Sequence, residues 1–279
     1  MTTDRYAVFG QPIKHSKSPR IHQLFAEQTG QALSYSAQEV PPERFQTAVT
    51  AFFAQGGKGL NCTVPLKGLA FAFADIKTER AQLSQAVNTL ALQADGSVLG
   101  DNTDGIGLVT DLTVNHALSL SGSRILILGA GGASRGIIGP ILEQSPNSVA
   151  IANRTVDKAV NLAQSFQARG NVYACGFDDL TEQSFDLILN ATSASLSDEL
   201  PPLPEGLLAK NGVCYDLAYG NKPTAFVRWG FEHHASQSLD GLGMLVEQAA
   251  EAFFIWRGVR PQTGPVIDLL NLERQKGQD

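Results

Sequence analysis

One short apolar run, followed at once by a glycine-rich turn, constrains the fold of this chain more than any other feature. Residues Arg124–Leu128 read RILIL, the pattern of a strand buried on both faces of a parallel sheet. The turn GAGGAS, residues 129–134, follows directly and leads into a helical pattern. A strand, a glycine turn and a helix in this order predict an α/β unit built on a parallel sheet.

The same turn is typical of a dinucleotide-binding site. Gly129 permits the sharp turn, Gly131 lets the backbone approach a pyrophosphate, and the helix that follows offers unpaired N–H groups. Ser134 takes the place of the third glycine of the fingerprint and is small enough for close packing. The residues expected at the cofactor phosphates are Gly129, Ala130, Gly131, Gly132 and Ala133. An ordinary glycine-rich turn without a ligand is the alternative, and the flanking strand and helix favour nucleotide binding.

The end of the next expected strand favours NADP over NAD. This strand, VAIA, is followed by Asn153, Arg154 and Thr155 and not by the carboxylate that would bind an adenosine 2′-hydroxyl. The Arg154 guanidinium can pair with a 2′-phosphate, while Thr155 can add a hydroxyl and Lys158 a positive charge. A surface arginine at a strand end is the alternative, and without the glycine turn the two would be equally plausible.

The length and the alternation of elements predict two α/β domains. At roughly 150 residues per domain, 279 residues correspond to about two. Short strand-like runs alternate with helical patterns from the N-terminus, which indicates βαβ units around a mostly parallel sheet, and a second series begins at Arg124–Leu128. Ser18 before Pro19 predicts a helix N-cap, the DG dipeptide at 95–96 a hairpin turn, and Gly258 the end of a final helix.

Composition excludes several classes of protein. Hydrophobic residues make up 43% and charged residues 17%, which is too apolar for a disordered chain, and the net charge of −6 gives no basic surface for nucleic acid. No apolar stretch reaches the roughly 18 residues of a membrane span, and the N-terminus lacks a signal-peptide pattern. Cys62, Cys175 and Cys214 are widely spaced, and no histidine pair has metal-ligand spacing, so we expect a reducing cytoplasm and no metal.

Several polar residues in the first part lie where strands turn into helices, the edge at which α/β sheets bind ligands. Ser16 and Ser18 present two hydroxyls at a helix start, which suits a carboxylate. The others are Asn61, Thr63, Lys67, Asn88 and Asp104. Singly, each has an ordinary alternative that is favoured: Ser18 and Asp104 as helix caps, and Lys67 as a solvated charge.

Eight sequence blocks occur together in a recognisable order: HSKSP, GGKGLNCTVPLK, AVNTL, GDNTDGIG, GAGGASRG, NRT, NATS and DGLGMLVEQAA. The order and approximate spacing of these blocks resemble those of the shikimate dehydrogenase family, and the resemblance covers nearly the whole chain. The NRT block is similar to the NADP-dependent biosynthetic branch and not to the quinate/shikimate branch. The resemblance implies reversible reduction of 3-dehydroshikimate to shikimate by NADPH, on the route to chorismate and the aromatic amino acids.

The resemblance also implies a domain plan. The family's chain crosses into the cofactor domain after GDNTDG and returns at DGLG, so that the last helix belongs to the first domain. We therefore expect residues 1–105 and 241–279 to bind substrate, and residues 106–240 to form a Rossmann-type NADP-binding domain. The expected partners are small molecules, with neither nucleic acid nor membrane, and the expected assembly is a monomer or homodimer.

Roles for individual residues follow from the same resemblance. Lys67 and Asp104 match the family's catalytic pair. Residues that match the substrate-binding set are Ser16, Ser18, Asn61, Thr63, Lys67, Asn88, Asp104, Tyr219 and Gln248. Residues that match the cofactor-binding set are Gly129, Ala130, Gly131, Gly132, Ala133, Asn153, Arg154, Thr155, Lys158, Thr192, Gly241 and Met244.

Three positions depart from the family pattern. Ser195 stands where the family usually has glycine, and we expect it to tighten the loop beside the nicotinamide. Cys62 replaces an aliphatic residue, and NKPTAF reverses the Thr-Pro order expected after Tyr219.

The chemistry of hydride transfer accounts for a lysine and aspartate pair. Hydride delivery to a ketone builds negative charge on the carbonyl oxygen, so a cation that can donate a proton there lowers the barrier. Lys67 meets both requirements, and Asp104 would hold its ammonium in place. His15, beside the serine pair, is a minor alternative acid. The open alternatives for function are a quinate/shikimate dehydrogenase with relaxed cofactor use, a non-catalytic NADP-sensing homologue and a folate-type dehydrogenase.

Overall fold

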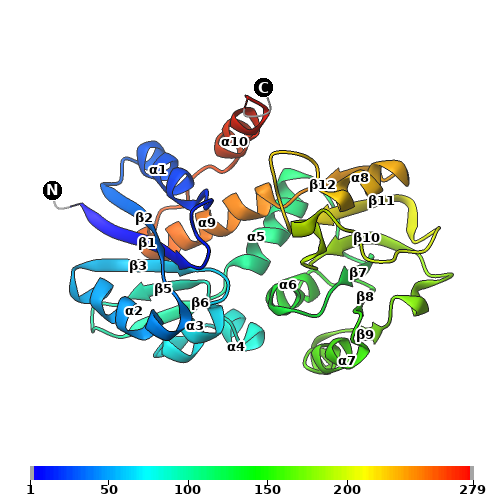
Figure 1. Ribbon diagram of the computed structural model, residues 1–279, viewed down its shortest axis with the longest axis horizontal. Coiled ribbons are helices and arrows are strands. Elements are labelled where there is room, and N and C mark those ends of the chain that lie inside the picture. Colours follow the sequence, from blue (N-terminus) through cyan, green and yellow to red (C-terminus); the bar gives the residue numbers. More distant parts are fainter. Residues whose placement is uncertain (1–2, 277–279) are drawn as a thin grey trace. The chain divides into compact units, whose positions relative to one another are not determined.

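The computed structural model describes residues 3–276, which divide into two compact units (Figure 1). The first unit comprises the residues up to Gly107 together with Leu245–Asp268. The second comprises Leu108–Met244 together with the residues from Leu269 on. The expected assignment of substrate to residues 1–105 and 241–279, and of NADP to residues 106–240, concerns ligands and stays a prediction.

The first unit is built on a mixed sheet with the strand order β2-β1-β3-β5-β6-β4. Its strands are β1 (Asp4–Gly10), β2 (Leu33–Glu39), β3 (Gly57–Cys62), β4 (Ile76–Lys77), β5 (Thr89–Leu92) and β6 (Val98–Asp101). Strand β1 pairs in parallel with β2 and β3, whereas β5 pairs antiparallel with β3 and β6. The predicted hairpin at 95–96 is confirmed, because Gly96 joins β5 to β6 with a φ of 88°.

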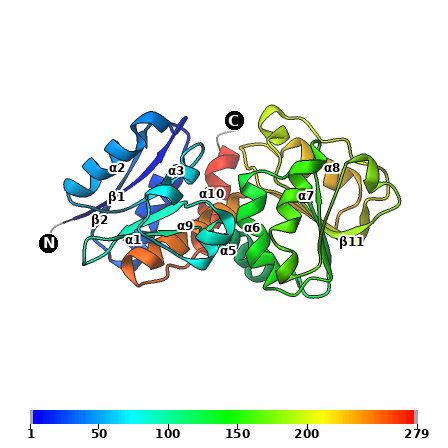
Figure 2. The same cartoon turned by 90° about the horizontal axis from the view of Figure 1, so that it is seen from below.

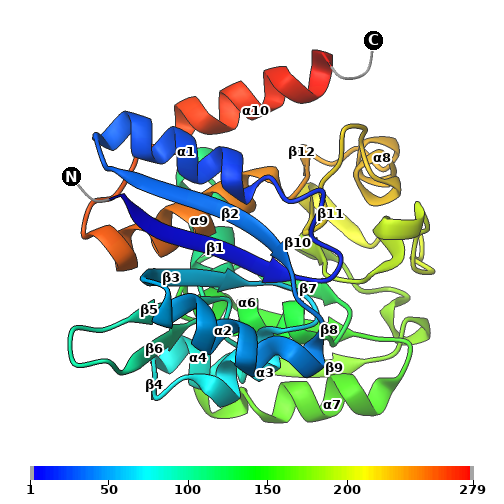
Figure 3. The same ribbon diagram turned by 60° about the vertical axis from the view of Figure 1, so that its left-hand side comes forward.

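Helices cover both faces of this sheet (Figure 3). They are α1 (Ser18–Thr29), α2 (Phe45–Ala54), α3 (Lys67–Phe73), α4 (Glu79–Ser84) and part of α9 (Leu242–Arg257). Side chains alternate along β1: Phe9 packs in a buried cluster with Phe52 of α2, while Tyr6 stacks on Trp256 of α9 at 4.7 Å between ring centroids. Helices α2, α3 and α4 therefore lie on one face, and α1 and α9 lie on the other.

The expected N-cap of α1 is wrong. Lys17 occupies the cap position with φ −82° and ψ −8°, and Ser18 is the first helical residue, with Pro19 in the first turn as predicted. The hydroxyl of Ser16 accepts a hydrogen bond from the Ser18 N–H at 3.3 Å. This bond satisfies a free N–H group of the helix end, so the Ser18 hydroxyl is available for other contacts.

The second unit is built on a parallel sheet with the strand order β12-β11-β10-β7-β8-β9. Its strands are β7 (Arg124–Leu128), β8 (Ser148–Ala152), β9 (Val172–Cys175), β10 (Phe185–Asn190), β11 (Leu208–Asp216) and β12 (Gln237–Leu239). The strand order reverses between β7 and β10, as in dinucleotide-binding Rossmann folds, and a ligand binds at the carboxyl ends of strands at such a reversal. The α/β class with a Rossmann-type domain, predicted from the sequence, is confirmed.

The helices of the second unit include α6 (Gly132–Leu142), α7 (Val156–Gln164) and α8 (Ala225–Glu232). Figures 1 and 2 show α6 and α7 on one face of the sheet and α8 on the other. The side chains of Ile125–Leu128 are fully buried between these layers, as the RILIL run predicts. Helix α5 (Asp104–Thr110) continues into a π-helical turn, Asp111–Asn115. Short 3-10 turns lie at Pro42–Arg44, Gln167–Arg169, Asp178–Leu180 and Ala194–Ser197.

The C-terminal part holds two helices. Gly258 ends α9 with a φ of 67°, and its N–H bonds to the Phe254 carbonyl, so the predicted end is confirmed. Helix α10 (Gly264–Lys276) had no counterpart in the sequence analysis. Among residues 3–276, no helix has the length and apolar character of a membrane span, and no group of His, Cys, Asp and Glu has the arrangement of a metal site.

Candidate functional site

A lysine and aspartate pair lies at the carboxyl edge of the first unit's sheet. Lys67 is the first residue of α3, after β3, and Asp104 is the first residue of α5, after β6. The Lys67 ammonium donates to Asp104 Oδ2 at 2.5 Å, and the two side chains are 27% and 13% exposed. The ammonium is therefore fixed by a counter-charge and remains accessible to a ligand.

The second oxygen of the same carboxylate is also bound. Asn88 donates from Nδ2 to Asp104 Oδ1 at 2.8 Å. The same Asn88 nitrogen and the Thr103 hydroxyl both lie 3.3 Å from Gln248 Oε1. With both oxygens engaged, Asp104 has one orientation, and so does the lysine that it holds.

Helix α9 brings Gln248 to this network, and two features fix the helix. Gly107 of α5 approaches it so closely that an added Cβ would lie 2.7 Å from the Gln248 Cβ. Arg80 of α4 donates to Asp101 Oδ2 at 2.5 Å and to Glu251 Oε1 at 3.1 Å, which ties α9 to the end of β6. Gln248 lies about one helical turn before Glu251.

Asn61, at the end of β3, extends the network toward α1. Its Nδ2 donates to the Asn88 carbonyl and to the Thr89 hydroxyl, each at 3.0 Å. Its Oδ1 accepts from the Tyr35 hydroxyl at 2.7 Å, and the Ser18 hydroxyl is hydrogen-bonded to that same tyrosine oxygen. Burial raises the pKa of Tyr35 well above its usual range, so this hydroxyl keeps its proton and donates.

The ring of His22 lies directly beneath Tyr35. The two rings are stacked at 4.2 Å with 7° between their planes, and Trp256 lies 5.3 Å away. Neither ring nitrogen of His22 has a hydrogen-bond partner within the described residues. Burial lowers the pKa of His22 to about 3, and the nearby Asn61 side chain offsets this only in part. His22 is therefore a neutral, apolar-packed ring.

The network joins some of the predicted substrate residues and not others. It contains Asn61, Lys67, Asn88, Asp104 and Gln248, with Ser18 attached through Tyr35. Ser16 reaches it through the Ser18 N–H, and Thr63 is half-buried just after β3. Tyr219 belongs to the second unit, in the loop after β11.

Residues Tyr35, Thr103 and Arg80 support the site but were not singled out from the sequence. Tyr35 lies on edge strand β2, where an alternating pattern gives no sign of what its hydroxyl binds. Thr103 lies inside the GDNTDG block, so its place next to Asp104 was the one available signal.

In the second unit, the predicted glycine turn joins β7 to α6. Gly129 has a φ of 101°, and an added Cβ would lie 3.1 Å from the Ala191 carbonyl oxygen, so glycine is required for two reasons. A Cβ added at Gly131 or Gly132 would meet nothing within 4 Å. The buried Ser134 hydroxyl donates to the Gly129 carbonyl at 2.8 Å and closes the turn. The turn therefore presents an open backbone surface at a helix N-terminus, which suits a pyrophosphate.

The remaining cofactor candidates follow other strand ends of the same sheet. After β8, the side chains of Arg154, Thr155 and Lys158 are exposed, and Asn153 Nδ2 shapes the loop by donating to the Thr155 carbonyl at 2.8 Å. Because their charged ends are open to solvent, the two cations can bind a phosphate without first breaking a buried contact.

Thr192 follows β10, and Gly241 and Met244 follow β12. A Cβ at Gly241 would lie 2.2 Å from the Leu217 carbonyl oxygen, so this glycine permits the close approach of the two loops. The Met244 N–H donates to the Tyr215 hydroxyl at 3.3 Å. Each of these positions lies at the carboxyl edge of the sheet.

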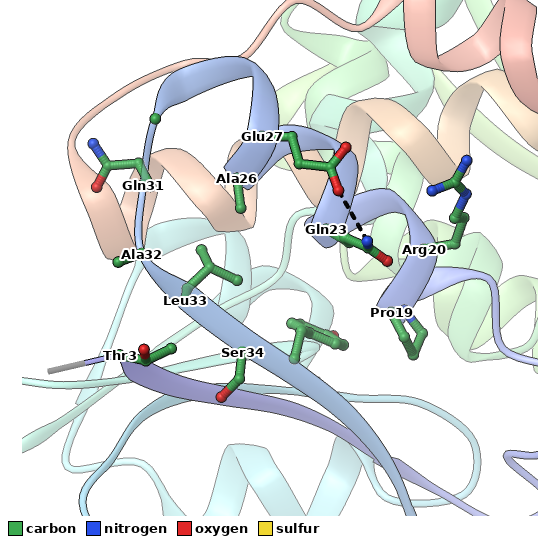
Figure 4. Close-up of a pocket in the computed structure, with 12 residues that line it drawn as sticks. Thr3, Pro19, Arg20, Gln23, Ala26, Glu27, Gln31, Ala32, Leu33 and Ser34 are labelled. Carbon is green, nitrogen blue, oxygen red and sulfur yellow. Dashed lines mark hydrogen bonds between the residues drawn. The ribbon is translucent and has the colours of Figure 1, made fainter.

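A separate hollow of about 780 Å³ opens between α1 and β2 (Figure 4). Its lining includes Arg20, Gln23 and Glu27 of α1, and Gln23 donates to Glu27 at 2.9 Å. The lining shares no residue with the Lys67 and Asp104 pair, although Tyr35 borders both regions.

The chain is similar to one family in its sequence and in its fold. The family model "Shikimate dehydrogenase substrate binding domain" matches residues 8–90, "Shikimate / quinate 5-dehydrogenase" matches residues 111–197, and "Shikimate 5'-dehydrogenase C-terminal domain" matches residues 241–270. A curated relative, shikimate dehydrogenase (NADP(+)) of Methylococcus capsulatus, is 62% identical over 272 residues, which cover 98% of both chains.

Two solved structures have the same fold. An Ael1 enzyme from Pseudomonas putida matches with a TM-score of 0.90 and 47% identity, over 96% of this chain and 98% of that one. Shikimate 5-dehydrogenase from Thermus thermophilus, solved with NADP(H) and shikimate, matches with a TM-score of 0.86 and 31% identity, over 98% of this chain and all of that one.

Proposed function

The chain belongs to the shikimate dehydrogenase family, and on that premise we propose how its residues perform the NADP-dependent, reversible reduction of 3-dehydroshikimate to shikimate. The observation that carries the proposal is the Lys67 ammonium, fixed at 2.5 Å from Asp104 at a sheet edge and still partly exposed. The alternatives of relaxed cofactor use, of a sensing role without catalysis and of a folate-type substrate are not favoured.

Lys67 acts as the acid in the reductive direction. It donates a proton to the carbonyl oxygen of 3-dehydroshikimate as negative charge develops there, while Asp104 holds the ammonium in position. In the oxidative direction the deprotonated lysine accepts the proton from the shikimate hydroxyl. Asn61, Asn88 and Gln248 hold the ring hydroxyls, and Ser16 and Ser18 hold the carboxylate.

The residues of the second unit fit NADP. When it is bound, its nicotinamide supplies or accepts the hydride. The open backbone at Gly131 and Gly132 would hold the pyrophosphate, and the exposed Arg154, with Thr155 and Lys158, would hold the 2′-phosphate. Thr192, Gly241 and Met244 would flank the nicotinamide.

We also propose a cytoplasmic location and a monomeric or homodimeric state. Three free, buried cysteines suit a reducing compartment. Size-exclusion chromatography with light scattering decides the oligomeric state.

One assay tests the function. Nicotinamide absorbance is followed with shikimate or quinate offered alongside NADP or NAD, in four combinations. We expect the highest kcat/KM for shikimate with NADP. Arg154→Ala should raise the KM for NADP by about 10- to 100-fold, while Arg169→Ala, an exposed control, leaves it unchanged. Equal kcat/KM for NAD and NADP in the unaltered chain would contradict the cofactor assignment.

A further inference from the structure

A fully buried carboxylate with four hydrogen bonds lies at the end of β11, next to the candidate cofactor site. Asp216 Oδ1 accepts from the Ala218 N–H at 3.0 Å and from Asn190 Nδ2 at 3.3 Å. Its Oδ2 accepts from the Ser195 hydroxyl at 2.5 Å and from the Thr224 hydroxyl at 2.6 Å. The side chain is 0% exposed, so all four donors come from the protein.

These donors belong to two different loops. Ser195 lies in the β10 loop, defined here as residues 190–198 and beginning with Asn190, the last residue of β10. Asn190 Nδ2 also donates to the Ser195 hydroxyl at 2.9 Å. Ala218 and Thr224 belong to the segment between β11 and α8, and Thr224 also caps α8. Asp216 therefore fastens both loops to one point.

The β10 loop packs against the glycine turn. Its Ala191 N–H donates to the Leu128 carbonyl at 2.9 Å, and a Cβ added at Gly129 would lie 3.3 Å from Thr192 Cγ2. Asn190 Oδ1 accepts from the Thr192 hydroxyl at 2.7 Å. A hydrogen-bonded path thus runs from Asp216 through Asn190 to the surface that would face the dinucleotide.

Burying a carboxylate in this way costs free energy of folding. Burial raises the pKa of Asp216 above its usual range, and its hydrogen bonds oppose this effect. An apolar residue would fill the position at lower cost if only packing mattered. The four donors, from two loops, indicate instead that its use is to hold those loops in one arrangement.

We propose that Asp216 is a positioning residue for the cofactor, and that Ser195 is the link through which it holds the β10 loop against the glycine turn. The inference rests on the proposed binding of NADP at the glycine turn, and it extends that proposal to residues that do not touch the cofactor.

The test compares Ser195→Ala, Ser195→Thr and the control Ser197→Ala, whose hydroxyl donates to the Ala194 carbonyl of its own turn. Calorimetric titration gives the Kd for NADP, and initial rates give kcat and both KM values. Ser195→Ala should raise the Kd for NADP by about 3- to 10-fold while kcat at saturating NADP and the KM for shikimate stay within about twofold. Ser195→Thr, which keeps the hydroxyl, should restore the Kd, and Ser197→Ala should not change it.

A double-variant cycle separates positioning from general loosening. If Ser195 acts through Asp216, adding Ser195→Ala to Asp216→Asn raises the Kd no further than Asp216→Asn alone. Additive effects, or an unchanged Kd in Ser195→Ala, would overturn the inference, and the Ser195 variants decide it even if Asp216→Asn does not fold. An unaltered chain that binds NADP but does not oxidise shikimate would refute the proposed function and leave this inference testable.

Discussion

The two candidate sites of this molecule are built in opposite ways. In the first unit, Lys67, Asp104, Asn88 and Gln248 already bind one another, so the site consists of side chains with assigned partners. In the second unit, the glycine turn presents backbone and empty space, and the charged side chains near it are exposed. The first site is preorganised by its own contacts, whereas the second leaves its groups free for a ligand.

This difference predicts different consequences of substitution. A change in the side-chain network disturbs neighbouring residues and affects stability together with the use of substrate. A Cβ added at Gly131 or Gly132 of the open turn meets no protein atom within 4 Å, so a change there should affect ligand binding alone. The predictions below test that contrast, beginning with the largest expected effect.

Removing the Lys67 ammonium from the network should give the largest loss of catalytic activity. Lys67→Ala removes the group proposed to accept the proton from the shikimate hydroxyl, and kcat for shikimate oxidation with NADP should fall by about 10²- to 10⁴-fold, while KM for shikimate changes far less. Steady-state rates measure both parameters. Lys77→Ala, which removes a lysine bound to the Ala74 carbonyl in the same unit, is the control. A Lys67→Ala variant with near-normal kcat would reduce Lys67 to a binding role.

The neutral ring beneath the network should make the first unit sensitive to acid. The pKa of His22 is about 3 in the folded protein, and the ordinary value of 6.5 applies to the unfolded chain, so below pH 6.5 the unfolded chain binds a proton that the native state does not. Stability is therefore lost as pH falls from about 6.5 toward 3. At pH 4.5 the loss amounts to about 2.7 kcal/mol.

Replacing the ring tests this linkage. His22→Phe keeps a stacked ring on Tyr35 but does not titrate, so the free energy of unfolding should fall less steeply between pH 6.5 and pH 4.5 than in the unaltered chain. Urea denaturation at each pH gives this slope, and any pH-independent packing cost of the larger ring cancels. His15→Gln, at an exposed histidine, should leave the slope unchanged. Parallel slopes for His22→Phe and the unaltered chain would show that His22 takes up a proton in the native state.

The second site offers the opposite test. Gly131 has φ −91° and ψ −170°, a conformation open to any residue, and an added Cβ meets nothing within 4 Å. Gly131→Ala should therefore leave the melting temperature unchanged and weaken NADP binding by at least about tenfold, because the methyl group would occupy the space of the pyrophosphate. Differential scanning fluorimetry and calorimetric titration measure the two quantities.

Two other glycines provide the comparison for Gly131. Gly129→Ala should lower the melting temperature as well, because its φ is 101° and its Cβ would press on the Ala191 carbonyl. Gly264→Ala, at an open position on α10, should change neither quantity. If Gly131→Ala bound NADP normally, the pyrophosphate could not lie against that residue.

The same contrast explains what the sequence could and could not predict. The glycine turn and the RILIL strand were readable because backbone conformation and burial restrict residue type locally. The roles of Tyr35 and Arg80 could not be predicted, because they depend on contacts with residues far away in the chain. The hydrogen bond from Arg80 to Glu251 is one such contact. The antiparallel pairing of β5 with β3 could not be predicted for the same reason, whereas its pairing with β6 was predicted by the DG dipeptide at 95–96. Ser18 was misplaced as a cap because Ser16, two residues earlier, satisfies its N–H.

The substitution Tyr35→Phe has the smallest expected effect, because it removes one hydroxyl from the side-chain network. Tyr35→Phe keeps the stacking on His22 but removes the donor to Asn61 Oδ1, which leaves a buried amide oxygen without its partner. The loss of about 1 kcal/mol should appear partly in stability and partly as a rise of about two- to fivefold in KM for shikimate.

The KM for NADP should stay unchanged in Tyr35→Phe, because the hydrogen bond that is removed joins two residues of the first unit. Tyr173→Phe, which removes a hydroxyl bonded to Gln183 in the second unit, is the matched control and should leave both KM values unchanged. A Tyr35→Phe variant that loses stability but keeps the KM for shikimate would show that Asn61 holds its orientation through Asn88 and Thr89 alone. In that case the preorganised part of the site ends at β3, and Tyr35 of β2 contributes packing without orienting Asn61.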